Sequence, residues 1–189
     1  RTFLSQYETG GLLPVWELAA NETFCMIGYH SIPVIYDAFN KGIRDYDLKK
    51  AFKAMRNSAD KDHLGLESYK KMGYVSSDFE HESVSKTLEY CYDDWCIAQM
   101  ALQLGYIDEH KIYLARSQNY KNIFDYESGF MNARKNGGFY SPFEPTEVNN
   151  NFTEANSWQY SFYAPHDLAG LIALHKSEAN FEKKLDELF

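Results

Sequence analysis

The chain of 189 residues is long enough for one domain with one continuous hydrophobic core, and a second domain is not required. Its 44% hydrophobic and 24% charged residues are typical of a globular protein and argue against a disordered one. The formal net charge of −8, without a cluster of Lys and Arg, argues against nucleic acid as a partner, and no apolar run is long enough to span a membrane.

The aromatic content is unusual for a helical domain. The 15 Tyr and 13 Phe exceed what a helical core needs, and Tyr combines an apolar face with a polar tip, which suits a sugar. For any single ring, core packing is the alternative. The three cysteines, Cys25, Cys91 and Cys96, cannot all pair within the chain, and we expect free thiols.

Apolar periodicity predicts helices along the first half of the chain. Between Trp16 and Gly42 an apolar stretch is interrupted by Pro33, which indicates a helix broken or started there. Residues Asp45 to Asp60 show the three-and-four spacing of an amphipathic surface helix. A longer helix is predicted from Ser83 to Leu104, ending at Gly105. Its apolar residues surround most of its circumference, so we expect an inner helix.

The second half combines helices with one long irregular segment. Asp108 is predicted to cap a third helix. From Tyr126 to Asn151 the helical period vanishes among Gly, Asn and Pro residues, and the aromatic content favours a functional loop over a disordered linker. Pro165 to Asp167 are predicted to open a short helix, and Ser177 to cap the last one. Since strand signals are weak, the predicted fold is mainly α.

Glu154 is the acidic residue that stands out beside this loop. Glycoside hydrolysis uses one carboxylic acid to protonate the leaving oxygen and a second carboxylate to activate water or attack carbon. Glu154 lies between the loop and four aromatic residues, and a carboxyl held against rings is desolvated, which raises its pKa and keeps it protonated. The alternative is that Glu154 caps a helix or is solvated. The neighbouring aromatic residues are Trp158, Tyr160, Phe162 and Tyr163.

Two segments resemble a known family. The first is Leu13–Thr23, with the sequence LPVWELAANET, continued by Cys25–His30 and Pro33–Ile35. The second is Thr153–Ser161, with the sequence TEANSWQYS, followed by Pro165–Asp167. The first resembles the opening of the helical domain in family 92 of the glycoside hydrolases, and the second is similar to the segment that carries that family's general acid. Their order and spacing extend the resemblance over nearly the whole chain.

The resemblance implies a fold and a function. It implies part of an (α/α)6 toroid with a long irregular aromatic loop, and a calcium-dependent, inverting exo-α-mannosidase of the α-1,2 type that removes terminal mannose from glycans. Glu154 then corresponds to the general acid. Most members are bacterial and are secreted, periplasmic or attached to the cell surface.

Several parts of the family pattern are missing here. The family's base is an aspartate in a Gly-Asn-Asp-Asp-Cys-Gly type segment, and neither that segment nor the later Asn-Glu-Pro-x-His-His type segment occurs. The preceding β-sandwich domain is also missing, and the chain begins at Arg1 without an initiator Met or signal peptide. We therefore expect residues 1–189 to be an incomplete, inactive part of a catalytic domain, with the remainder of the parent enzyme as its partner. The competing hypothesis is a non-catalytic helical module that binds carbohydrate or protein.

Other residues are weaker candidates. Trp16, Glu22, His30 and Gln159 lie in the two segments and are predicted to bind substrate by stacking and hydrogen bonding, with packing or loop anchoring as the alternative. The pair Asp93–Asp94 could supply calcium ligands. Because adjacent helical residues point in different directions, we interpret the pair as helix surface. The calcium ligands themselves are not predicted.

Overall fold

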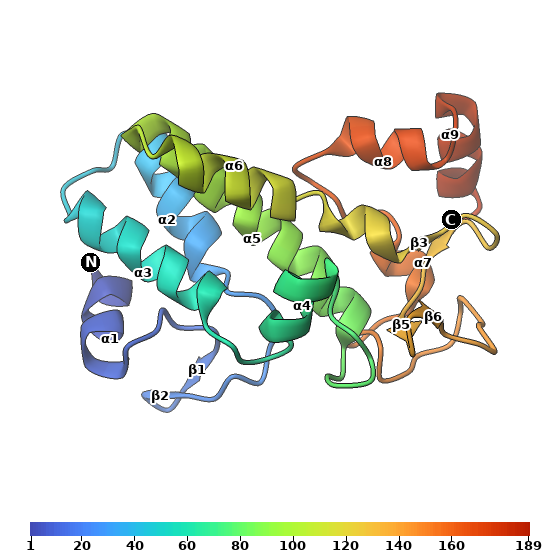
Figure 1. Ribbon diagram of the computed structural model, residues 1–189, viewed down its shortest axis with the longest axis horizontal. Coiled ribbons are helices and arrows are strands. Elements are labelled where there is room, and N and C mark those ends of the chain that lie inside the picture. The colour runs from blue at the N-terminus through green and yellow to red at the C-terminus, as the bar shows by residue number, and fades with distance from the viewer.

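The structure is a computed structural model in which all 189 residues are described, and helices form most of its regular structure (Figure 1). This confirms the prediction of a mainly helical fold. The helices are α1 (Thr2–Gly10), α2 (Ser31–Asn40), α3 (Leu48–Asp60), α4 (Leu66–Met72), α5 (Ser83–Leu104), α6 (Ile107–Arg116), the 3-10 helix η1 (Asn119–Ile123), α7 (Ser157–Tyr160), α8 (Leu168–Leu174) and α9 (Glu178–Asp186).

Three short antiparallel hairpins are the only sheets, so none of them forms a layer of the fold. The strands are β1 (Glu17–Leu18) with β2 (Asn21–Glu22), β3 (Phe124–Asp125) with β4 (Phe130–Met131), and β5 (Arg134–Lys135) with β6 (Gly138–Phe139). The β1–β2 and β5–β6 hairpins lie toward the lower edge of Figure 1, as does the N-terminal end of α5.

Helix α5 is the centre of the molecule. It packs along α6 and also contacts α2 and α3, which surround it in Figure 1. The chain reverses between α5 and α6 at Gly105, whose φ of +81° is a left-handed conformation that glycine adopts without steric cost. Side chains all around α5 are buried, including Leu88, Ile97 and Met100. The predicted inner helix and both of its ends are therefore confirmed.

The helix starts test the predicted caps. Ser177 accepts a hydrogen bond from the backbone N–H of Asn180 at 3.1 Å, so its predicted cap is confirmed. Asp167 caps α8 by accepting from the backbone N–H of Gly170 at 2.9 Å, which agrees with the helix start predicted at Pro165 to Asp167. The predicted cap at Asp108 is wrong, because α6 begins at Ile107 and Tyr106 holds the capping position. The Asp108 carboxylate lies within the first turn, where it is favourably placed in the field of the helix dipole.

The segment from Tyr126 to Asn151 is irregular, as predicted, apart from strand β4 and the β5–β6 hairpin. Its rings divide between surface and interior, since Tyr126 and Phe139 are exposed. Phe130 is buried and meets Trp158 edge-on, with ring centroids 4.6 Å apart. The backbone N–H of Met131 donates to Ser161 Oγ at 2.8 Å. The loop is thus fastened to the second of the two segments that carry the family resemblance.

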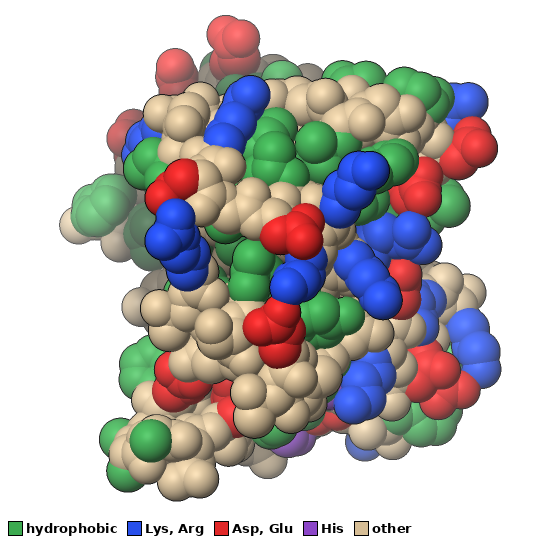
Figure 2. Space-filling view, turned by 90° about the vertical axis from the view of Figure 1, so that its left-hand side faces the viewer, with side chains coloured by type: hydrophobic (Ala, Val, Ile, Leu, Met, Phe, Trp, Pro, Cys, Tyr) green, Lys and Arg blue, Asp and Glu red, His purple; other side chains and the backbone are tan.

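The outer surface mixes charges of both signs. Figure 2 shows Lys and Arg interspersed with Asp and Glu over the face that lies at the left of Figure 1, with hydrophobic side chains exposed between them. None of the helices combines the length and the apolar character needed to cross a membrane. Cys25 is exposed, Cys91 and Cys96 are buried, and all three are free thiols.

Candidate active site

Glu22 organises the loop that carries Trp16. Its Oε2 accepts a hydrogen bond from the backbone N–H of Val15 at 2.6 Å, and its Oε1 accepts from Trp16 at 2.9 Å and Phe24 at 2.8 Å. Burial acts to raise the pKa of Glu22, but these backbone donors outweigh it and lower the pKa. The ionised carboxylate therefore holds the hairpin in shape, and a direct contact of Glu22 with sugar stays a prediction.

Trp16 and His30 line one hollow. Its volume is about 320 Å³, and Phe3, Pro14 and Ser31 contribute to its walls. The Trp16 side chain is 50% exposed, so an aromatic face is available beside the ring of His30. Small-molecule sites combine apolar walls with a few polar groups, and a hollow of this size is at the lower end of their range. Two of the predicted substrate-binding residues thus come together.

Both ring nitrogens of His30 are engaged by carboxylates of α5. Nδ1 lies 2.9 Å from Asp93 Oδ1, and Nε2 lies 2.9 Å from Glu89 Oε2. Burial acts to lower the pKa of His30, but the charge of Asp93 and the hydrogen bonds to both carboxylates outweigh it and raise the pKa to about 10. His30 is therefore an imidazolium whose two N–H groups both donate to the protein. Any contact with sugar would use the carbon edge of the ring.

The position of the His30 ring next to Glu89 depends on Gly28. Gly28 has a φ of +76°, and a Cβ built on it would lie 2.5 Å from His30 Nε2. A side chain at this position would displace the imidazole and strain the backbone. The glycine in the Met-Ile-Gly-Tyr-His sequence thus allows the ring to reach Glu89.

The charge of His30 makes the stability of the fold depend on pH. The pKa is raised from an unfolded value of about 6.5, so the contribution of this pairing is complete below that value and is lost as the pH rises through about 10. We expect the difference in free energy of unfolding between the wild-type chain and the His30→Gln variant to narrow over this range. Urea unfolding at successive pH values measures it, and a constant difference would contradict the assignment.

Asp93 and Asp94 are completely buried, so the interpretation of this pair as helix surface is wrong. Each carboxylate has partners on a different side of α5. Asp93 accepts from the backbone N–H of Tyr29 at 2.8 Å as well as from His30. Asp94 accepts from the hydroxyls of Tyr29 at 3.0 Å and Tyr69 at 2.9 Å and from Arg116 Nε at 2.8 Å. These partners lie on elements distant in sequence, which is why the helical pattern alone did not reveal the burial.

The same partners bear on the calcium that the resemblance implies. Donors from the protein already surround the carboxylates of Asp93 and Asp94. No group of three or more His, Cys, Asp or Glu side chains in the chain is arranged to hold a metal ion. The residues present therefore do not form a complete calcium site, and no chemical step is derived through calcium.

In the second segment, hydrogen bonds of the neighbouring Thr153 hold the backbone at Glu154. The N–H of Thr153 donates to Ser85 Oγ in the first turn of α5 at 2.9 Å, and the hydroxyl of Tyr160 donates to the carbonyl of Thr153 at 3.2 Å. Glu154 itself has a φ of +52°, an exposed side chain and no hydrogen bond or ion pair within the chain. The expected desolvation of its carboxyl by aromatic rings is therefore not present in this structure.

Gln159 has a local structural role. Its backbone N–H donates to Asn156 Oδ1 at 3.3 Å, and its Oε1 accepts from the backbone N–H of Asn156 at 3.2 Å, which together form a capping box at the start of α7. The side chain is exposed and its amide Nε2 makes no hydrogen bond within the chain. The Nε2 group remains available to a ligand, so substrate binding stays a prediction for Gln159.

Glu89 joins the two segments, and it was not among the predicted site residues. Its Oε2 accepts a hydrogen bond from the hydroxyl of Tyr163 at 2.6 Å, in addition to the contact with His30 Nε2. His30 belongs to the first segment, and Tyr163 follows Ser161, the last residue of the second. The available signal was spacing: Glu89 precedes Asp93 by one helical turn, so the two carboxylates share a face of α5.

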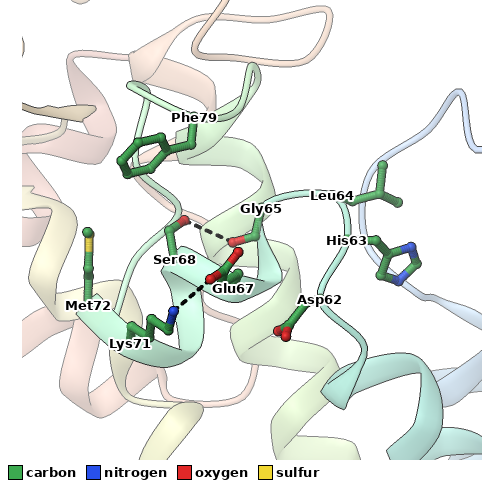
Figure 3. Close-up of a pocket in the computed structure, with 9 residues that line it drawn as sticks. All are labelled: Asp62, His63, Leu64, Gly65, Glu67, Ser68, Lys71, Met72 and Phe79. Carbon is green, nitrogen blue, oxygen red and sulfur yellow. Dashed lines mark hydrogen bonds and ion pairs between the residues drawn. The ribbon is translucent and has the colours of Figure 1, made fainter.

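A second hollow, of about 380 Å³, lies beside α4 and contains none of the predicted site residues (Figure 3). Figure 3 shows Ser68 Oγ donating to the carbonyl of Gly65 at 2.9 Å and Lys71 Nζ paired with Glu67 Oε1 at 2.6 Å. These polar groups already have partners within the same turn of helix, and exposed ion pairs of this kind contribute little stability. We therefore centre the candidate site on Trp16, His30 and Glu89. Glu154 is a candidate on the second segment, and its side chain forms no hydrogen bond or ion pair with these three residues.

The similarity to known proteins extends over the whole chain. Residues 1–189 match the sequence model of the glycosyl hydrolase family 92 catalytic domain. A solved family 92 α-mannosidase from Bacteroides thetaiotaomicron is 40% identical with a TM-score of 0.95, and the match covers 100% of this chain and 26% of that one. A family 92 inverting mannosidase from the same organism is 35% identical with a TM-score of 0.93, covering 98% of this chain and 26% of that one.

A curated relative from Arthroderma benhamiae, described as an uncharacterized secreted glycosidase, is 27% identical over 226 residues, which cover 98% of this chain and 29% of the relative. The chain therefore spans between a quarter and a third of the length of these relatives. The close structural likeness confirms the predicted fold class, since the chain forms part of an (α/α)6 toroid. The chain belongs to the catalytic domain of glycosyl hydrolase family 92.

Proposed function

We propose that the chain provides the acid-bearing part of the active site of an α-mannosidase, with Glu154 as the general acid. The observation that carries this proposal is the meeting of the two segments at Glu89, through His30 on one side and Tyr163 on the other. A loop with an exposed Trp and a loop with a free Glu are thereby fastened to the same helix. Family membership supplies the chemistry that such an arrangement serves.

The relatives support the substrate class. Two of the solved family members are named as mannosidases, one of them as inverting, and one was solved in complex with mannoimidazole. We propose that the longer protein removes terminal mannose from glycans with inversion, acting from chain ends on α-1,2 linkages. Inversion requires a base about 6.5 to 9.5 Å from the acid, which leaves room for a water molecule. We place that base outside residues 1–189.

The conformation of Glu154 supports a functional role. A φ of +52° is unusual for a residue with a side chain, and such strained positions cluster at active sites when their surroundings hold them. Here the hydrogen bonds of Thr153 to Ser85 and Tyr160 fix the backbone while the carboxyl stays free. An acid that is protonated near neutral pH must be desolvated. We propose that residues outside this chain cover Glu154 in the longer protein.

The remaining predicted residues take supporting roles in this proposal. Trp16 offers an aromatic wall beside the hollow, and the free Nε2 of Gln159 can donate to a sugar hydroxyl. Glu22 acts through the loop that it holds, and His30 acts through Glu89. We also propose a requirement for calcium, with a ligand set completed outside this chain, and secretion, as in the relative named a secreted glycosidase.

The proposal is tested by following the full-length protein with an α-1,2-linked mannobioside and calcium by proton NMR. The first mannose released is expected to be the β-anomer, because inversion of an α-glycoside gives the β-product before mutarotation. Removing calcium with a chelator is expected to stop release, and adding it back to restore it. Initial release of the α-anomer would contradict inversion, and the absence of turnover on any α-mannoside would contradict the function.

A further inference from the structure

Glu89 lies at the point where the two segments meet, and one of its two oxygens has no partner. Oε2 accepts from His30 Nε2 at 2.9 Å and from the Tyr163 hydroxyl at 2.6 Å. Oε1 accepts no hydrogen bond from the chain. It is also not one of the solvent-inaccessible polar atoms, so solvent reaches it. The side chain is 12% exposed, so Oε1 is accessible while the rest of the carboxylate is held.

The surroundings fix the orientation of this free oxygen. His30 is held in turn by Asp93, and Tyr163 follows the Glu154 segment on the chain. A carboxylate has about four lone-pair sites, and two donors on Oε2 leave those of Oε1 for a ligand. Because both donors belong to the protein and one is an imidazolium, Glu89 is positioned before any ligand arrives.

The charge of the cluster selects the ligand class. Two carboxylates, those of Glu89 and Asp93, flank the single imidazolium of His30, so the cluster presents hydrogen-bond acceptors and does not favour an anionic ligand. A ligand must instead donate hydrogen bonds. Hydroxyl groups of a neutral sugar do so. The rings of Tyr160 and Tyr163 pack against the hydrophobic core, and the Tyr163 hydroxyl reaches Glu89.

We propose that Glu89 is a substrate-binding residue whose Oε1 accepts a hydrogen bond from one ring hydroxyl of the mannose, and that His30 and Tyr163 are its positioning residues. This inference rests on the proposed function. It names a contact that neither segment contains, on a helix between them in sequence.

The test combines variants of Glu89 with altered substrates in the full-length protein. The substrates are an aryl α-mannoside and its monodeoxy analogues, each lacking one ring hydroxyl. For Glu89→Ala, kcat/KM on the complete substrate is expected to fall by about tenfold to a hundredfold, the usual effect of removing a hydrogen bond to a charged group. For one deoxy analogue, kcat/KM of the wild type is expected to fall by a similar factor relative to the complete substrate. On that analogue, Glu89→Ala is expected to be nearly as active as the wild type.

Two other variants separate binding from folding. Tyr163→Phe keeps the Glu89 carboxylate and removes one of its donors. We expect kcat/KM to fall less than in Glu89→Ala, and this variant should still hydrolyse the same deoxy analogue more slowly than the complete substrate. Glu67→Ala removes an exposed carboxylate in the first turn of α4 and is expected to leave kcat/KM unchanged. If Glu89→Ala fails to fold, Glu89→Gln keeps the side-chain volume and is compared in the same substrate series.

The outcomes distinguish this inference from the proposed function. If the wild type hydrolyses the mannoside but the Glu89 variants lose the same factor on every analogue, Glu89 supports only the fold and the inference is overturned. If the Glu89 variants are as active as the wild type, it is also overturned. If the wild type hydrolyses no mannoside at all, the proposed function itself fails, and the inference with it.

Discussion

Replacing Glu154 by Gln in the full-length protein is expected to lower kcat on a mannose disaccharide by about 10² to 10⁴, the usual contribution of a general acid. Gln keeps the shape of the side chain but has no proton to give to the departing oxygen. Substrate binding should largely survive, because the Glu154 backbone is held by Thr153, Ser85 and Tyr160 rather than by its own side chain. Steady-state kinetics with calcium present measure the effect.

Glu147 provides a matched control in the same loop. It is also an exposed carboxylate, and its contact is with Asn149 in its own turn, at 3.0 Å. Glu147→Gln is expected to leave kcat close to the wild-type value. A similar loss in both variants would indicate that charge in this loop matters in general, and Glu154 would lose its assigned role.

The second large effect is expected on stability, at the buried Asp94. Replacing Asp94 by Ala removes the carboxylate that accepts from Tyr29 and Tyr69 and pairs with the buried guanidinium of Arg116. Arg116 then keeps its contacts to Asp60 and Ala59 and its stacking on the rings of Tyr69 and Tyr113, but loses its buried counter-charge. Breaking a buried ion pair by removing one partner costs about 3–5 kcal/mol. We expect the free energy of unfolding, measured in urea, to fall by about that amount.

The exposed pair of Glu67 and Lys71 supplies the comparison for this prediction. Both side chains are largely solvated, so Glu67→Ala is expected to change the free energy of unfolding by about 1 kcal/mol or less. If Asp94→Ala costs no more than this control, the network around Asp94 does not stabilise the fold in the way its geometry suggests.

The sequence was most informative where a local rule determines the structure. Helix α5 was predicted with both ends, because its apolar residues and the glycine that follows it are local signals. The helix start at Pro165 to Asp167 and the cap at Ser177 were predicted for the same reason. Helices α1, α4 and α7 were missed. Helix α4 has only 7 residues, between Gly65 and Gly73, which is too short for its periodicity to be distinguished from a turn.

The candidate site was harder to predict because its contacts are distant in sequence. The bond from the N–H of Tyr29 to Asp93 joins residues 64 positions apart, and that from the hydroxyl of Tyr163 to Glu89 joins residues 74 apart. Periodicity describes the face of a helix but not its partners, so Asp93 and Asp94 were wrongly interpreted as surface. The family resemblance directed attention to the two segments but did not identify the carboxylate that connects them.

Comparing leaving groups shows whether Glu154 protonates the leaving oxygen. The phenolate released from an activated aryl mannoside needs little protonation. The second sugar of a disaccharide would leave as a poorly stabilised alkoxide unless an acid protonated it. If Glu154 is the general acid, Glu154→Gln in the full-length protein loses much less turnover on the aryl mannoside than on the disaccharide. Equal losses on both substrates, or undiminished turnover of the disaccharide, would contradict this role.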